Sequence, residues 1–179
     1  MSGHIQSLAS RAGLVLPPVL AILLVLPGSA SAAVSRYYTF AGAEVWATST
    51  VGTFVGLSLG STGDYGSWRA SIEHSVQTEP QGWITGGYAE VYTSDLTHVR
   101  GDFTGGTLVL VSTGSGPCGM LTHDIYGTLA NVVRSDSTRV GTGSFVGRLF
   151  HYRVWVLGTC LIYSASVSGT MTLSFTGNN

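Results

Sequence analysis

The chain has 179 residues, and only 9% of them are charged, whereas charged residues make up about a quarter of an average soluble protein. All eight of its basic residues are arginine, so the lysine chemistry of Schiff bases, pyridoxal enzymes and phosphate-binding P-loops is excluded. The net charge of −1 lacks the basic footprint that nucleic-acid binding needs, and we expect no nucleic-acid partner. Hydrophobic residues make up 44% of the chain, which indicates a folded domain rather than a disordered one.

Residues 1–33 have the pattern of a secretory signal peptide. An apolar run over 14–26 follows a single arginine, and 30–32 then supply the small residues that a signal peptidase recognises. The run is shorter than the roughly 20 residues that a transmembrane helix needs. We therefore expect cleavage near Ala32, a single domain over 34–179 and a secreted, periplasmic or cell-surface location. We expect no stable membrane span in the mature form.

Two cysteines, Cys118 and Cys160, follow the predicted leader. An even number of cysteines in an exported chain favours a disulfide. The bond would close a loop of about 42 residues, and two buried free thiols are the alternative. Neither cysteine has a Cys or His within four residues, so the spacing does not indicate a metal site. We predict no metal and no cofactor.

Beyond residue 33 apolar and polar residues alternate, and no segment has sustained helical periodicity. The strand formers Val, Thr, Tyr, Phe and Trp dominate, and glycine-rich turns separate the alternating segments. The predicted strands cover 36–47, 51–59, 66–77, 84–93, 97–103, 106–113, 119–133, 143–157 and 160–175. We predict an all-β fold, a small antiparallel up-and-down barrel of about eight or nine strands, with a two-sheet β-sandwich as the alternative.

The register of the last two predicted strands decides which of their residues face inward. Gly158 and Thr159 fit a two-residue hairpin loop with glycine first, as in a type II′ turn. In that register Leu157 lies opposite Cys160, and Arg148 faces inward. The outward face then carries apolar side chains beside basic ones, a composition found in contact patches, although it would be core in a sandwich. We predict a surface contact site made up of Trp155, Leu149, Arg153, Ile162 and His151.

Several polar residues fall on faces that could line a pocket. His74 shares its face with Ile72, and His123 shares its face with Ile125. Inward imidazoles can act as acid and base, bind a metal, or be hydrogen-bonded core residues. Glu90 lies on one face with two tyrosines, an arrangement seen where a carboxylate contacts a sugar or lines a pocket, although a solvated face explains it as well. The pocket candidates are His74, His123, Glu90, Tyr88, Tyr92 and Arg148.

The sequence leaves three hypotheses about function. The first is an exported, non-catalytic binding or structural module whose partner is a small molecule, a glycan or a protein. The second is an extracellular hydrolase or isomerase with His74 and His123 in its pocket, which two inward imidazoles close to a carboxylate would favour. The third is a small outer-membrane barrel, in which the apolar faces would point outward to lipid.

Overall fold

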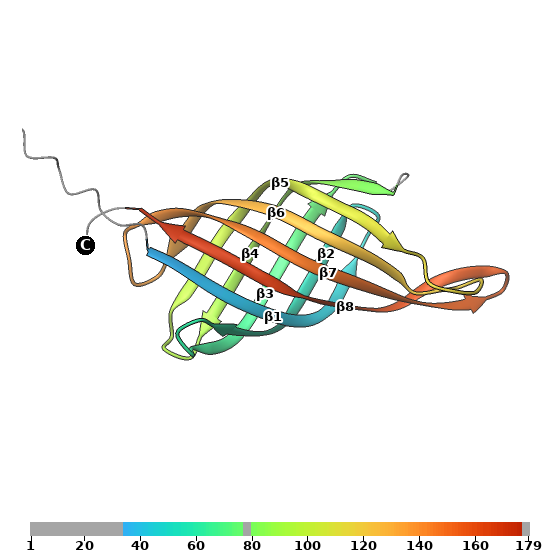
Figure 1. The fold of residues 1–179 in the computed structure, drawn as a ribbon, viewed down its shortest axis with the longest axis horizontal. Coiled ribbons are helices and arrows are strands. Elements are labelled where there is room, and N and C mark those ends of the chain that lie inside the picture. The colour runs from blue at the N-terminus through green and yellow to red at the C-terminus, as the bar shows by residue number, and fades with distance from the viewer. Residues whose placement is uncertain (1–33, 77–79, 177–179) are drawn as a thin grey trace, which may run out of the picture. The chain divides into compact units, whose positions relative to one another are not determined.

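The computed structural model describes residues 34–76 and 80–176 and forms a closed antiparallel barrel of eight strands, shown in Figure 1. The strands are β1 (Val34–Ala47), β2 (Val51–Gly60), β3 (Tyr65–His74), β4 (Gln81–Thr93), β5 (His98–Ser112), β6 (Leu121–Arg134), β7 (Val140–Val156) and β8 (Thr159–Phe175). Each strand pairs with its neighbours in sequence, and β1 pairs with β8 to close the barrel. The predicted antiparallel barrel is confirmed, and the sandwich alternative is wrong. The predicted signal peptide lies outside the described residues.

The middle of the barrel is a packed apolar core. The ring centroids of Phe40 and Trp68 are 4.6 Å apart, and those of Phe40 and Phe145 are 4.5 Å apart. A Cβ atom on Gly169 would lie 2.8 Å from the Phe40 ring, so the glycine leaves the space that this ring fills. Small eight-stranded barrels have an interior just wide enough for side chains, and here aromatic rings occupy it. In the described residues, no apolar helix has the length to cross a membrane.

The predicted turn at Gly105 and Gly106 is wrong, because 97–103 and 106–113 belong to one continuous strand, β5. The glycine pair lies where the register against β6 shifts, and Gly106 has a φ of 148°. A Cβ atom at Gly106 would lie 2.0 Å from the carbonyl oxygen of Tyr126, so only glycine lets the two strands approach here. Two adjacent glycines are equally typical of a hairpin turn, and for this reason the sequence pattern led to the wrong prediction of a turn.

The hairpin between β7 and β8 turns one residue earlier than predicted. Leu157 and Gly158 form its loop, with φ values of 46° and 86°, as in a type I′ turn. A further register shift follows, so that inside the barrel the strands are paired one residue out of the predicted register. A slip of one residue exchanges the two faces of a strand. Leu149 and His151 therefore face inward and Arg148 faces outward, the reverse of the prediction for all three.

The predicted disulfide between Cys118 and Cys160 is confirmed, with a Cα–Cα distance of 5.5 Å, and the free-thiol alternative is wrong. Cys118 lies in the loop before β6 and Cys160 lies on β8, so this loop has to cross the end of β7. Arg153 of β7 holds the loop there, because its Nε and Nη2 donate to the carbonyl oxygen of Gly119 at 2.8 and 2.5 Å. The loop and the projecting hairpin thus form one cross-linked unit.

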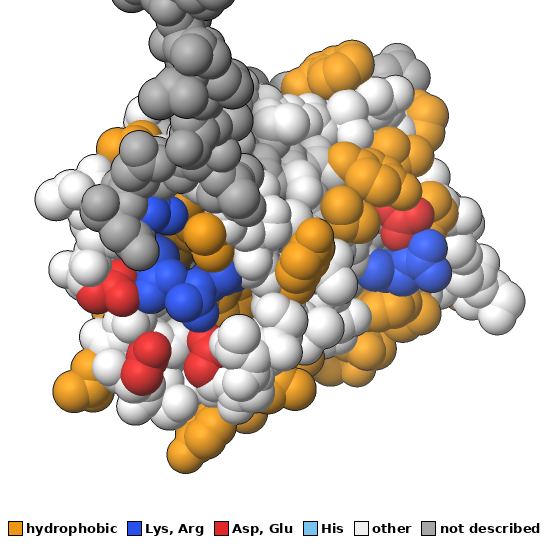
Figure 2. All heavy atoms as spheres, turned by 60° about the vertical axis from the view of Figure 1, so that its left-hand side comes forward, with side chains coloured by type: hydrophobic (Ala, Val, Ile, Leu, Met, Phe, Trp, Pro, Cys, Tyr) orange, Lys and Arg blue, Asp and Glu red, His pale blue; other side chains and the backbone are white. Residues whose placement is uncertain are grey.

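The two ends of the barrel carry different side chains. The end where β1 begins is named the charged end here; its loops are 61–64, 94–97 and 135–139, and each contains an aspartate. Basic and acidic side chains gather at this end in Figure 2. The opposite end is named the open end. Its described loop residues are 48–50, 75–76, 80, 113–120 and 157–158, and the β7–β8 hairpin projects beyond it (Figure 1).

The loop aspartates of the charged end are bonded to their own neighbours. Asp95 accepts hydrogen bonds from the hydroxyl of Thr93 at 2.5 Å and from the backbone nitrogen of Thr97 at 3.0 Å. These hydrogen bonds, that of Thr93 first, lower the pKa of Asp95 to about 2. Asp136 accepts from Nε and Nη2 of Arg134 at 2.8 and 2.5 Å. Aspartate is favoured in turns for this kind of local bond.

Candidate functional site

A cavity of about 480 Å³ opens at the open end of the barrel. Its walls are mostly apolar, and its deeper part lies on the packed core. The apolar lining includes Phe54, Ile72, Leu108, Ile125, Leu149 and Ala165, while Val45, Trp46, Val76, Ile162 and Tyr163 line it as exposed side chains. Small-molecule sites usually measure about 300–1,000 Å³ and combine apolar walls with a few polar groups. The size and lining of this cavity fit that description.

Glu44 and His151 are polar residues in this cavity, from β1 and β7. Oε2 of Glu44 lies 3.5 Å from Nε2 of His151, and the two side chains are only 10% and 14% exposed. Gly52 makes room for the carboxylate, because a Cβ atom there would lie 2.8 Å from Oε1 of Glu44. The register of β1, β2 and β7 thus brings a carboxylate and an imidazole together inside the barrel.

His123 lies next to this pair on β6. Its ring centroid is 5.3 Å from that of His151, edge to face, and its side chain is buried. Burial, and to a smaller extent the nearby charges of His151 and His74, lower the pKa of His123 from its ordinary value of 6.5 to about 4. His123 is therefore neutral near pH 7.

The hydrogen bonds of the histidines fix which ring nitrogens can donate. Nδ1 of His74 lies 2.9 Å from the carbonyl oxygen of Ser75. A carbonyl can only accept, so this nitrogen carries the proton, and Nε2 of the neutral ring is left as an acceptor. In His151, Nε2 faces the carboxylate of Glu44 at 3.5 Å, and Nδ1 is the other ring nitrogen. That Nδ1 is buried and has no hydrogen-bond partner in the part of the chain that the structure describes.

His74 and His123 both lie at the open end, as their predicted inward faces implied, and His74 lines the cavity. Glu44 was not among the predicted pocket residues. Its position nevertheless falls on the same alternating face of β1 as Tyr38 and Phe40, which are buried. His151 was predicted outside the barrel because of the register error in the last hairpin.

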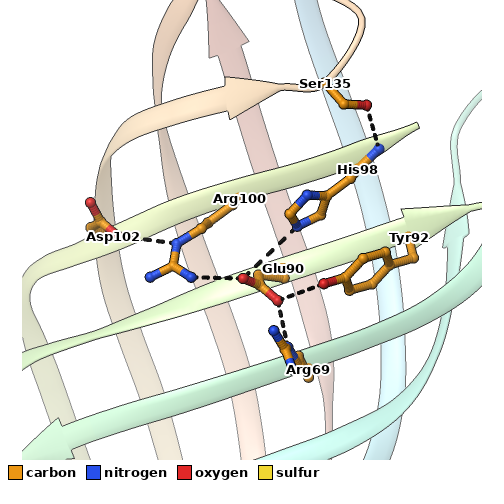
Figure 3. A network of polar contacts seen from close by, with 7 residues as sticks. All are labelled: Arg69, Glu90, Tyr92, His98, Arg100, Asp102 and Ser135. Carbon is orange, nitrogen blue, oxygen red and sulfur yellow. Dashed lines mark hydrogen bonds and ion pairs between the residues drawn. The ribbon is translucent and has the colours of Figure 1, made fainter. Parts of the chain in front are cut away.

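Glu90, Tyr88 and Tyr92 do not line this cavity. Glu90 and Tyr92 lie on the outer face of β4, as Figure 3 shows, and Tyr88 falls on the same alternating face of this strand. Glu90 is nevertheless only 2% exposed, because side chains from β3 and β5 cover it. Arg69 donates to it in an ion pair, Arg100 Nη1 donates at 2.8 Å and the Tyr92 hydroxyl at 3.0 Å. Burial by itself would raise the pKa of Glu90, but these three hydrogen bonds outweigh it and the pKa is lowered.

The aromatic rings around Glu90 also contact other side chains of the protein. The guanidinium of Arg100 lies 4.3 Å from the Tyr88 ring centroid, and the His98 ring stacks on Tyr92 at 4.4 Å. Arginine on an aromatic face is a favourable contact that also holds both groups in place. This outer network therefore joins β3, β4 and β5, and its partners come from the protein itself.

The predicted surface contact site is divided by the structure. Leu149 is 2% exposed in the core, and His151 lies in the cavity, so their predicted exposure was wrong. Trp155 and Ile162 are 57% and 52% exposed, at the projecting hairpin. Arg153 is bonded to the disulfide loop. The predicted pocket residue Arg148 instead forms a two-point ion pair outside the barrel with Asp124, at 2.7 and 3.1 Å.

Comparison of the chain with family models, curated proteins and solved structures found no match. Among the described residues, no group of three or more His, Cys, Asp and Glu side chains is arranged to hold a metal ion. The chemistry of the open-end cavity is thus the basis for inferring a function.

Proposed function

We propose that the protein is an exported, non-catalytic binding module that holds a small, largely apolar ligand in the open-end cavity. The observation that carries this proposal is the cavity itself, about 480 Å³ in volume, with apolar walls and a small number of polar groups. Export is supported by the signal-peptide pattern of residues 1–33 and by the disulfide, which is typical of oxidising compartments.

The rim of the cavity supports a ligand with an apolar body. Trp46, Ile162 and Tyr163 line the cavity and are each more than half exposed. Large exposed apolar side chains are costly to leave in water, so a group of them around a cavity is typical of a binding site. An apolar ligand would cover part of this surface as well as the deeper walls.

The outer-membrane alternative is less well supported by the distribution of side chains. Membrane barrels carry an apolar band outside and a polar interior. Here Phe40, Trp68 and Phe145 pack in the interior. The outward positions of β8 from Ser164 to Ser174 are all serine or threonine, which favours contact with water.

An acid–base enzyme is the second candidate function. It is favoured by the 3.5 Å approach of Glu44 and His151 inside the cavity, with His74 on the same lining. A carboxylate that orients an imidazole is the arrangement used for general acid–base catalysis. This candidate predicts turnover of a bound compound, whereas a binding module releases it unchanged.

Binding of the uncharged fluorescent probe N-phenyl-1-naphthylamine tests the proposal. Ala165→Phe fills the lining of the cavity, and Ser168→Phe makes a matched change on the outward face of the same strand. We expect saturable probe fluorescence with the wild type and the Ser168 variant, and an affinity reduced roughly tenfold or more in the Ala165 variant. Wild-type protein that fails to bind, or an Ala165 variant that binds as the wild type does, would overturn the proposal.

A further inference from the structure

We infer that the ligand of the open-end cavity carries a protonated amine on its apolar body, and that Glu44 binds this group. The inference rests on the proposed function and adds the chemical class of the ligand. The supporting observation is that Glu44 and the histidines of the cavity have unused hydrogen-bonding capacity.

The side chain of Glu44 is mostly buried, and its carboxylate lacks close hydrogen-bond donors among the described residues. Its side chain is 10% exposed, and in the described parts of the chain its recorded polar contact is Nε2 of His151 at 3.5 Å. Hydrogen bonds to carboxylates are normally about 2.7–2.9 Å long, so this contact is loose. A buried carboxylate retains a large cost of desolvation until donors approach it.

Glu90 is a buried carboxylate of the same protein that has several hydrogen-bond donors. It is 2% exposed and accepts from Arg69, Arg100 and Tyr92. Glu44 is almost as buried, yet none of the arginines that the structure describes lines its cavity. The missing donors at Glu44 are the ones that a ligand would bring.

The histidines of the site add acceptors rather than donors. His74 donates from Nδ1 to the carbonyl of Ser75, so Nε2 of its neutral ring is an acceptor, and Nδ1 of His151 is buried without a partner within the described residues. A ligand carboxylate or phosphate would meet acceptors and one formal negative charge. An ammonium group supplies up to three donors and a positive charge, which matches the carboxylate and the lone pairs together.

The shape of the site places that amine beside apolar surface. Oε1 of Glu44 lies over Gly52, and Phe54 and Ile72 line the same cavity. A ligand whose amine reaches Glu44 would therefore extend its remaining atoms along apolar walls towards the exposed Trp46 and Tyr163. The matching ligand class is an amphiphile with one cationic, hydrogen-bond-donating head.

Three ligands that differ only in their head group test the inference: decylamine, decanol and decanoate, each displacing N-phenyl-1-naphthylamine near neutral pH. On the wild-type protein we expect decylamine to bind roughly tenfold or more tightly than decanol, and decanoate to bind more weakly than both. In Glu44→Gln the preference for the amine should disappear while decanol binds as before. Glu73→Gln, the same change at an exposed carboxylate on the outer face of β3, should keep the wild-type ranking.

The outcomes separate this inference from the proposed function. Equal binding of all three ligands, or tightest binding of decanoate, would overturn the amine inference and leave an apolar pocket in place. Failure of all three ligands and of the probe would overturn the proposed function itself. The ranking on the wild-type protein is decisive even if Glu44→Gln does not fold, and unchanged binding of decanol by that variant reports that its cavity is intact.

Discussion

The loop aspartates at the charged end of the barrel are hydrogen-bonded to nearby side chains and backbone, whereas the carboxylate in the open-end cavity has one long polar contact within the described residues. Asp95 and Asp136 accept hydrogen bonds from neighbours in or next to their own loops. At the open end, Glu44 has a loose contact with His151, and ring nitrogens of His123 and His151 are buried without hydrogen bonds within the described residues. Buried polar atoms are nearly always hydrogen-bonded, and Arg36 Nε, Ser58 Oγ and His98 Nε2 near the charged end also lack a partner within the described residues. The open end therefore differs in its cavity and in the loose contact of Glu44.

The polar contacts of the two regions also differ in kind. The outer Glu90 network and the loop aspartates of the charged end are built from hydrogen bonds and ion pairs within the protein. The open end has a cavity, exposed apolar side chains and unmatched acceptors, and its projecting hairpin is cross-linked by a disulfide. The disulfide and the register of β7 and β8 constrain the open end, whose interior holds a cavity rather than a fully packed core.

The largest expected effect on stability comes from removing the disulfide. A bond that closes 42 residues restricts the unfolded chain, and chain entropy predicts a loss of about 4 kcal/mol in the double variant Cys118→Ser, Cys160→Ser. Urea unfolding of wild type and variant measures the difference. Reducing agent should lower the stability of the wild type and leave the variant unchanged; an effect below about 1 kcal/mol would mean that Arg153 already holds the loop in place.

The second effect is a loss of stability in acid that depends on His123. Its pKa is about 4 in the folded protein and 6.5 ordinarily, so the unfolded chain takes up the proton first as the pH falls. The contribution of His123 to the free energy of unfolding is complete above about pH 6.5. It is lost towards pH 4 at about 1.4 kcal/mol per pH unit, or ~3 kcal/mol in total.

Urea unfolding across this pH range, with His123→Leu as the comparison, measures the effect. The wild type should lose more stability than the variant between these pH values. Parallel curves for the two proteins would show that His123 titrates normally in the fold.

A smaller effect compares the two buried carboxylates directly. Glu90→Gln should destabilise the fold by about 2 kcal/mol, because charged hydrogen bonds from half-exposed arginines are lost. Glu44→Gln should change stability by less than about 0.5 kcal/mol or raise it, since a buried charge with loose contacts is removed. Thermal or urea unfolding of both variants decides the point, and equal losses would mean that Glu44 is held as firmly as Glu90.

The smallest expected effect on stability is that of Trp155→Ser. The indole is 57% exposed on the projecting hairpin, and surface substitutions usually change stability by less than about 0.5 kcal/mol. We expect the melting temperature to stay nearly unchanged while self-association or partner binding weakens, as measured by sedimentation and by binding assays. A large loss of stability would instead place Trp155 in a packed part of the open end.

Much of the fold and part of the site followed from local sequence patterns. Alternation identified the inward faces that hold Trp68 and Ile72 on β3, and Ile125 and His123 on β6, because the side-chain period of a strand is fixed at two. The same alternation along β1 places Glu44 on the inward face with Tyr38 and Phe40. The even cysteine count predicted the disulfide from the chemistry of exported proteins.

Register and curvature, by contrast, were decided only by the tertiary structure. The glycine pair at 105–106 can form a turn or a bulge, and closure of the barrel against β6 selects the bulge. The sequence of the last hairpin fits a loop at 158–159 as well as one at 157–158. The structure has the second, with Leu149 in the core and His151 beside Glu44. By itself the sequence determined the strands, most of their faces and the cross-link, because these depend on residue type and spacing. Which carboxylate meets which imidazole depends on contacts between strands far apart in the chain, and those contacts exist only once the barrel has closed.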